Sequence, residues 1–131
     1  MRFGFVGLGQ MGAPMAINLA KAFDVTIFDK NTEIMSAVAK KGANALVRPD
    51  QFSEVDALFL CLPNADTVKH VLLDIENGFA QYLKKETIII DTGTTEYGAT
   101  LDLNTKLNTI GLQFLDAPVS GMSVRAKNAS L

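Results

Sequence analysis

The sequence is poor in several residue types, and each scarcity excludes a class of protein. Its 131 residues include no tryptophan, one histidine and one cysteine, Cys61. A single cysteine cannot form an intrachain disulfide, and no spacing of histidine, cysteine and acidic residues suggests a metal site. A chain without disulfides fits a reducing compartment, so we expect a cytoplasmic protein.

The chain also lacks a charge excess and a long apolar run. Twelve basic residues face fourteen acidic ones, for a net charge of -2, and no basic stripe stands out. Nucleic acid is therefore not expected as a partner. No apolar run approaches the roughly 18 residues of a membrane span, so no membrane partner is expected. Met1-Arg2 leads directly into an apolar run, which predicts no signal or transit peptide.

What the chain does contain is a regular alternation of short apolar runs with helix-length segments. At 48% apolar residues it can bury a sizeable core, and its length predicts one domain, residues 1–131. Several runs are continuous, as in strands buried on both faces. We expect strands at 3–6, 25–28, 43–47, 57–62, 87–90 and 113–115, and helices at 11–22, 32–41, 65–73 and 95–107. This order predicts an α/β fold with a doubly wound, mainly parallel sheet.

A glycine-rich turn joins the first expected strand to the first expected helix. It reads Gly7-Leu8-Gly9-Gln10-Met11-Gly12. Gly7 permits a tight turn, Gly9 lets the backbone approach a pyrophosphate, and Gly12 lets the helix pack close to the strand. Free amides at the helix start, with the helix dipole, then hold the anion. The motif predicts a dinucleotide-binding (Rossmann) domain; a turn that merely joins strand to helix is the plainer alternative.

Asp29 ends the second expected strand, 22 residues after Gly7. A carboxylate at this place accepts hydrogen bonds from the adenosine ribose of a dinucleotide. It also repels the additional 2′-phosphate of NADP, although the neighbouring Lys30 offsets part of that repulsion. We therefore expect NAD as the cofactor, with NADP less favoured; an ordinary turn acid is the alternative for Asp29.

Two segments together resemble the β-hydroxyacid dehydrogenases, the family of 3-hydroxyisobutyrate dehydrogenase. The stretch GLGQMGAPMAINL, residues 7–19, is similar to the family's N-terminal signature. The stretch DAPVSG, residues 116–121, is similar to its substrate-binding segment. The resemblance spans nearly the whole chain, and it implies an enzyme that exchanges a hydride between NAD(P) and a short 3-hydroxy acid.

The resemblance also implies cofactor contacts beyond the glycine turn. Leu62-Pro63 falls where a loop of the family lines the cofactor site, and Thr67 where relatives often place a cofactor-contacting asparagine. Thr94 matches the threonine of the family's Asp-x-Ser-Thr and would lie near the nicotinamide ribose. The alternatives are a plain strand end for Leu62-Pro63 and a helix cap for Thr94.

In the family, the hydroxyl and amides of the loop containing Ser120 and Gly121 grip the substrate carboxylate. A helix cap is the alternative for Ser120. The chain departs from the family at positions 122, 124 and 125. Met122, Val124 and Arg125 replace residues of a Ser-Gly-Gly…Gly-Ala pattern. Lost glycines can block close backbone approach to a ligand, which keeps open a non-catalytic nucleotide-binding or scaffold module.

The resemblance further implies what lies beyond these residues. The family adds two strands, a long helix that carries the catalytic lysine in Gly-x-x-x-Lys-x-x-Asn, and a C-terminal helical domain. That motif does not occur here. We therefore expect an incomplete domain that lacks activity by itself and is monomeric, whereas a full-length relative forms homo-oligomers. A third interpretation is 6-phosphogluconate dehydrogenase, which uses NADP and which Asp29 fits poorly.

Overall fold

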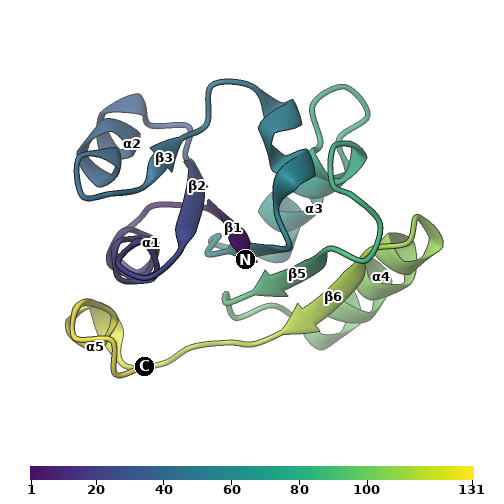
Figure 1. Cartoon of the computed structure of the whole chain (residues 1–131). Helices are drawn as coiled ribbons and strands as arrows, with labels where there is room; N and C mark the ends of the chain where they lie inside the picture. The colour runs from purple at the N-terminus through teal and green to yellow at the C-terminus, as the bar shows by residue number, and fades with distance from the viewer.

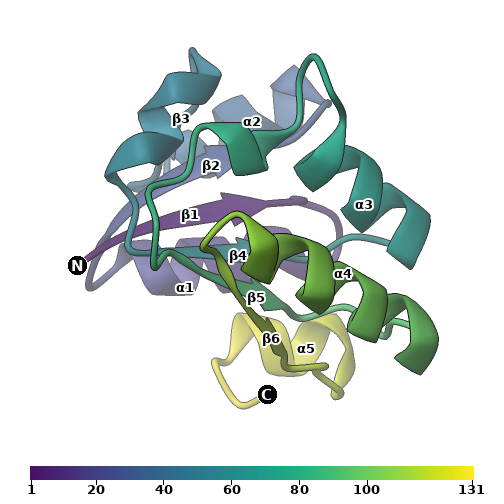
Figure 2. The same cartoon turned by 90° about the vertical axis from the view of Figure 1, so that its right-hand side faces the viewer.

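Six parallel strands form one sheet in the computed structural model, which describes residues 1–131 (Figure 1). The strands are β1 (Arg2–Val6), β2 (Asp24–Phe28), β3 (Asn44–Ala45), β4 (Ala57–Leu60), β5 (Ile88–Asp91) and β6 (Gln113–Asp116). Their order is β3-β2-β1-β4-β5-β6, and every neighbouring pair is parallel. Figure 2 shows them side by side, from β3 at the top to β6 at the bottom. The direction of winding reverses between β1 and β4, which confirms the predicted doubly wound fold.

Helices cover both faces of this sheet. They are α1 (Gly12–Ala20), α2 (Thr32–Ala39), α3 (Ala65–Leu73), α4 (Tyr97–Thr109) and α5 (Met122–Lys127), with short 3-10 helices η1 (Pro49–Glu54) and η2 (Phe79–Gln81). The α1 and α2 helices lie on one side, and α3 and α4 on the other (Figure 1). None of the helices is of a length and apolarity that would let it cross a membrane.

The two faces of the sheet carry separate apolar clusters, which explains the continuous apolar runs. In β1, Phe5 packs with Ala16 of α1 and Ile27 of β2, whereas its neighbour Val6 packs into the cluster on the opposite face. Successive strand side chains point to opposite faces, so a strand covered on both sides must be apolar at every position.

The expected strand at 43–47 was too long, because the chain leaves the sheet after Ala45. The Gln51 side-chain oxygen accepts hydrogen bonds from the amides of Val47 (2.7 Å) and Arg48 (2.8 Å), and Pro49 then begins η1. The expected helix at 95–107 lies two residues later, at Tyr97–Thr109. The sequence did not predict η1, η2 or α5.

The α5 helix lies against α1 through tertiary contacts rather than through a strong pattern of its own. Ala126 is buried, and the Asn18 side-chain amide donates to the carbonyl oxygens of Ala126 (2.8 Å) and Lys127 (3.2 Å). These bonds bring residues more than a hundred positions apart side by side, below α1 in Figure 1.

Candidate functional site

The glycine turn has the geometry that its spacing predicts. Gly7 has φ +94°, a conformation that favours glycine, and its amide donates to the Phe28 carbonyl oxygen at 3.0 Å. A Cβ on Gly12 would overlap the Gly7 carbonyl oxygen, so only glycine lets α1 start this close to β1. A Cβ on Gly9 would meet no atom within 4 Å. The structural roles expected for Gly7 and Gly12 are confirmed, and Gly9 faces open space.

The start of α1 carries hydrogen-bond donors that the protein does not use. The amides of Gly9, Gln10, Met11 and Gly12 donate to no acceptor in the chain. No side chain caps the helix, and its first turn contains no acidic residue. Unused donors and the positive end of the helix dipole make this turn suited to bind an anion such as a pyrophosphate.

Asp29 lies directly beside the turn, at the end of β2. Its Oδ2 accepts from the Leu8 amide at 2.7 Å, and its Oδ1 accepts from the Asn31 amide at 2.8 Å. The Leu8 amide is therefore already engaged, unlike the four amides that follow it. The Leu8 side chain is buried in the core, so Leu8 anchors the turn to the domain and its side chain does not face a ligand.

A cavity of about 300 Å³ opens between the turn, the end of β2 and α3. Seven residues expected at the cofactor site line it: Gly7, Gly9, Asp29, Lys30, Leu62, Pro63 and Thr67. Sequence reasoning missed four others: Val6, Phe28, Cys61 and Val71. Val71 had a usable signal, since it follows Thr67 by one helical turn and shares its face.

Two lining residues have surroundings that the sequence did not indicate. The Thr67 hydroxyl donates to Asn64 Oδ1 at 2.8 Å, and its amide donates to the same atom at 2.9 Å, so Thr67 completes the cap of α3. Cys61 directly follows β4 and is half-buried at the cavity wall. Burial raises the pKa of its thiol.

The loop after β5 is organised by a buried carboxyl group. Asp91 accepts from the Gly93 amide at 2.9 Å and from the Thr95 hydroxyl at 2.8 Å. Burial, reinforced by the nearby Asp116 carboxylate, raises the pKa of Asp91. The Thr94 side chain is exposed and forms no hydrogen bond, and Glu96 occupies the cap position of α4. Thr94 is therefore not the helix cap.

The segment containing Ser120 runs beside the end of β5, because the Val119 amide donates to the Thr92 carbonyl oxygen at 3.3 Å. Ser120 is exposed, and its hydroxyl and amide have no acceptor or donor partner in the chain. Gly121, with φ +133°, occupies the cap position of α5, so Ser120 does not cap that helix. Ser120, Gly121 and Thr94 lie outside the 300 Å³ cavity, farther along the same edge of the sheet.

Two residues that depart from the family's pattern, Met122 and Arg125, shape this loop. Met122 adopts φ +60°, a left-handed conformation that is uncommon outside glycine, and its side chain is exposed. The alkyl stem of Arg125 fills the space above Gly121, where an added Cβ would lie 2.9 Å from Arg125 Cβ. The backbone at Met122 therefore has a conformation that is typical of glycine, and the Arg125 side chain covers Gly121.

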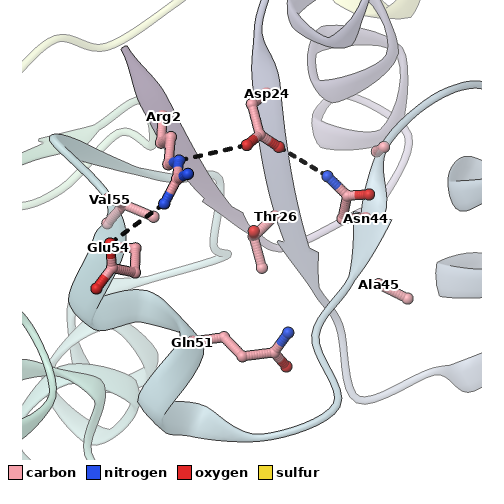
Figure 3. A pocket seen from close by; sticks show the side chains of 9 residues that line it. Arg2, Asp24, Thr26, Asn44, Ala45, Gln51, Glu54 and Val55 are labelled. Carbon is pink, nitrogen blue, oxygen red and sulfur yellow. Dashed lines mark hydrogen bonds and ion pairs between the residues drawn. The ribbon is translucent and has the colours of Figure 1, made fainter.

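A second, larger pocket of about 550 Å³ opens at the opposite, amino edge of the sheet (Figure 3). Its charged groups form ion pairs with one another. Arg2 pairs with Asp24 (3.6 Å) and Glu54 (3.2 Å), and the Asn44 amide donates to Asp24 Oδ1 at 2.7 Å. None of the residues that the sequence nominated lines this pocket.

Known proteins resemble the chain over nearly its full length. It is 36% identical over 130 residues to 3-sulfolactaldehyde reductase of Escherichia coli, which covers 97% of the chain and 43% of that relative. It is 35% identical over 130 residues to the mitochondrial 3-hydroxyisobutyrate dehydrogenase of Drosophila melanogaster, covering 98% of the chain and 39% of the relative. The chain thus spans less than half the length of these curated relatives.

Solved structures agree with this relationship. The 3-hydroxyisobutyrate dehydrogenase of Mycobacterium tuberculosis, solved with L-serine, superposes with a TM-score of 0.89 at 29% identity, over 98% of the chain and 43% of that structure. Residues 2–131 match the model of a family described as the NAD binding domain of 6-phosphogluconate dehydrogenase. With the glycine turn, the sheet order and these relatives in agreement, the chain belongs to this family of NAD-binding domains.

Proposed function

We propose that this chain is the cofactor-binding part of an oxidoreductase that exchanges a hydride between NAD and a short 3-hydroxy acid. The observation that carries the proposal is the row of unused amides at Gly9 to Gly12, next to open space above Gly9. Free amides at a helix start that no side chain caps, together with the positive end of the helix dipole, favour an anionic ligand at this turn. The pyrophosphate of a dinucleotide fits this arrangement.

The remainder of the dinucleotide extends from the turn in two directions. Asp29 receives the adenosine ribose, and the apolar wall of Phe28, Leu62 and Val71 suits a flat base in the adjoining cavity. The Asp29 carboxylate disfavours a 2′-phosphate, and Lys30 offsets only part of that repulsion, so NAD is preferred over NADP.

The substrate lies at the other end of the cofactor, near Ser120 and Gly121. Both have amides without an acceptor, and Ser120 adds an unused hydroxyl, which together suit a substrate carboxylate. The names of relatives, 3-sulfolactaldehyde reductase and 3-hydroxyisobutyrate dehydrogenase, favour a short acid that carries an alcohol or aldehyde.

The chain's own residues bind and orient rather than move protons. When bound, NAD supplies the hydride acceptor, and these residues fix its position relative to the substrate. Thr94 lies near the nicotinamide end, on a loop that Asp91 holds in place. The proton of the substrate hydroxyl passes to a lysine outside these residues, as the family resemblance implies. The 131-residue chain is then a single monomeric domain that binds NAD weakly and catalyses no reaction.

Isothermal titration calorimetry of the 131-residue chain with NAD and with NADP tests this proposal. Weak binding of NAD and weaker binding of NADP are expected; no heat with either would contradict the function. Spectrophotometric assay of 3-hydroxyisobutyrate oxidation is expected to show no turnover, and clear turnover would contradict the external lysine. Analytical ultracentrifugation checks the monomeric state.

A second candidate is a non-catalytic module that senses the nucleotide. Met122 and Arg125 favour this candidate, because they replace small residues of the family's pattern. The alkyl stem of Arg125 also covers Gly121, which the substrate carboxylate would approach. The two candidates are distinguished by the NMR chemical shifts of the Ser120 and Gly121 amides when 3-hydroxyisobutyrate is added to the NAD-loaded chain. Saturable shifts that Ser120→Ala weakens support the dehydrogenase, and their absence supports the sensor.

A further inference from the structure

The Asp29 carboxylate joins three segments of the chain. Asp29 follows β2, its Oδ2 accepts from Leu8 in the glycine turn (2.7 Å), and its Oδ1 accepts from Asn31 (2.8 Å). The Asn31 side chain in turn caps α2 by accepting from the amides of Glu33 (3.0 Å) and Ile34 (3.2 Å). The turn after β1 and the first residues of α2 are therefore linked through one side chain.

The other contacts of the turn between Gly7 and the start of α1 are the buried Leu8 side chain and helical bonds that the Gly9 and Met11 carbonyl oxygens accept. Gly7 donates to Phe28, but the amides from Gly9 to Gly12 make no bond within the protein. Asp29 is the one side chain that hydrogen-bonds to the backbone of this turn. A carboxylate offers about four lone-pair sites, so two backbone donors leave capacity for ribose hydroxyls.

We propose that Asp29 is a positioning residue for the pyrophosphate turn as well as the acceptor for the ribose. Pyrophosphate affinity and the preference for NAD over NADP then depend on the same carboxylate. Replacing Asp29 to admit the 2′-phosphate of NADP also loosens the turn that binds the pyrophosphate. This inference rests on the proposed function, because it assigns the turn to a dinucleotide.

For an anion that has no ribose, the charge of Asp29 and its hydrogen bond to Leu8 have opposite effects on binding affinity. Removing the Asp29 charge from the neighbourhood of an anion should tighten anion binding if the turn keeps its shape. Removing the hydrogen bond to Leu8 should weaken binding if Asp29 holds the turn. Inorganic pyrophosphate therefore distinguishes the two roles by the sign of the change.

The experiment titrates the ¹⁵N-labelled 131-residue chain with inorganic pyrophosphate at fixed ionic strength and follows the amide signals of residues 9–12. Asp29→Ala is expected to weaken pyrophosphate binding at least fivefold and to speed hydrogen exchange of the Leu8 amide. The matched control is Asp24→Ala, which removes the same charge from the amino end of β2 and should leave the affinity unchanged. Tighter or equal binding by Asp29→Ala would overturn the inference.

Asp29→Asn provides a second test that does not depend on the alanine variant folding. Its oxygen can still accept from Leu8, and the charge is gone. Two outcomes support the positioning role. In the first, the Leu8 amide stays protected from hydrogen exchange and the affinity for pyrophosphate is kept or raised. In the second, the protection of the Leu8 amide and the affinity for pyrophosphate fall together. An unprotected Leu8 amide with undiminished affinity contradicts it. If the parent chain binds neither pyrophosphate nor NAD, the proposed function itself fails.

Discussion

The two edges of the sheet offer cavities of different size and different chemistry. The amino edge holds the larger one, about 550 Å³, and the carboxyl edge holds one of about 300 Å³. At the amino edge Arg2, Asp24 and Glu54 pair with one another. At the carboxyl edge the amides from Gly9 to Gly12 have no partner. Free backbone amides at a helix start, rather than volume, distinguish the edge that is suited to an anionic ligand.

The difference follows from the topology. All six strands are parallel, so each helix that follows a strand begins at the carboxyl edge. Helix starts have free N–H groups and the positive end of the dipole, whereas the amino edge receives helix ends. Placing the switch point between β1 and β4 then opens a crevice beside the first of these helix starts.

The largest expected effect on stability and binding comes from adding a methyl group where α1 lies closest to the end of β1. Gly12→Ala puts a Cβ onto the Gly7 carbonyl oxygen, and backbone must move to relieve the overlap. We expect a loss of about 2–3 kcal/mol in unfolding free energy, as for overpacked sites, together with loss of NAD binding. Urea denaturation and calorimetry measure the two effects.

Gly98→Ala is the matched control. Gly98 lies in α4, and its added Cβ would meet no atom within 4 Å. Alanine there should stabilise the chain by up to about 1 kcal/mol, because glycine is a poor helix former. Equal behaviour of the two variants would contradict the close approach of α1 to β1.

The next largest effect separates binding from folding. Gly9→Val adds a side chain to open space, so the unfolding free energy should stay within about 0.5 kcal/mol of the parent, as at ordinary surface sites. The added side chain occupies the space assigned to the pyrophosphate, so NAD affinity should fall more than tenfold. Unchanged NAD affinity would mean that the glycine turn does not bind the cofactor, and that free amides do not distinguish the carboxyl edge from the amino edge.

Much of this arrangement could be predicted from the sequence because it depends on local rules. Gly7 and Gly12 stand where a left-handed turn and a backbone contact exclude any Cβ, and such positions accept only glycine. Asn31 is of a residue type that favours the cap position before a helix, and its side chain accepts from the amides of Glu33 and Ile34 in the first turn of α2. Continuous apolar runs predicted strands buried on both faces, as the two clusters confirm.

The remainder depends on contacts between distant residues. The hydrogen bond from Leu8 to Asp29 joins residues 21 positions apart, and no local pattern marks it. The α5 helix has six residues and is held by Asn18 rather than by its own periodicity. The strand at 43–47 was overestimated because the Gln51 side chain, four residues beyond Val47, captures its amide. Side chains that bond to the backbone in this way defeat patterns based on hydrophobicity alone.

A smaller effect concerns pH and the loop behind the carboxyl edge. Because burial raises the pKa of Asp91, the folded chain holds this proton more tightly than the unfolded chain. The stability from this group is complete in acid and declines as the pH rises through the folded-state pKa. The stability of Asp91→Asn relative to the parent should therefore increase from acid to neutral pH, as measured by urea denaturation across that range.

Asp102→Asn gives the control of opposite sign. The hydrogen bond from Lys106 lowers the pKa of Asp102, so the parent gains stability as the pH rises and loses it in acid. The stability of this variant relative to the parent should decrease toward neutral pH. If the Asp91 difference were flat or followed the Asp102 trend, the carboxyl group of Asp91 would not be the buried, proton-holding group that orders the loop.

The smallest effect is expected at the amino edge, in spite of its larger pocket. Arg2→Met breaks both ion pairs in Figure 3 and keeps the backbone bond from residue 2 to Asp56 Oδ2 (2.9 Å). Exposed ion pairs contribute little, so the unfolding free energy should fall by less than about 1 kcal/mol, and by less still at high salt. NAD affinity should stay within twofold of the parent in calorimetry, because these paired charges lie at the edge of the sheet opposite the glycine turn. A tenfold loss of NAD affinity would mean that the two edges are coupled through β1 and β2, and that unused donors alone do not define the site.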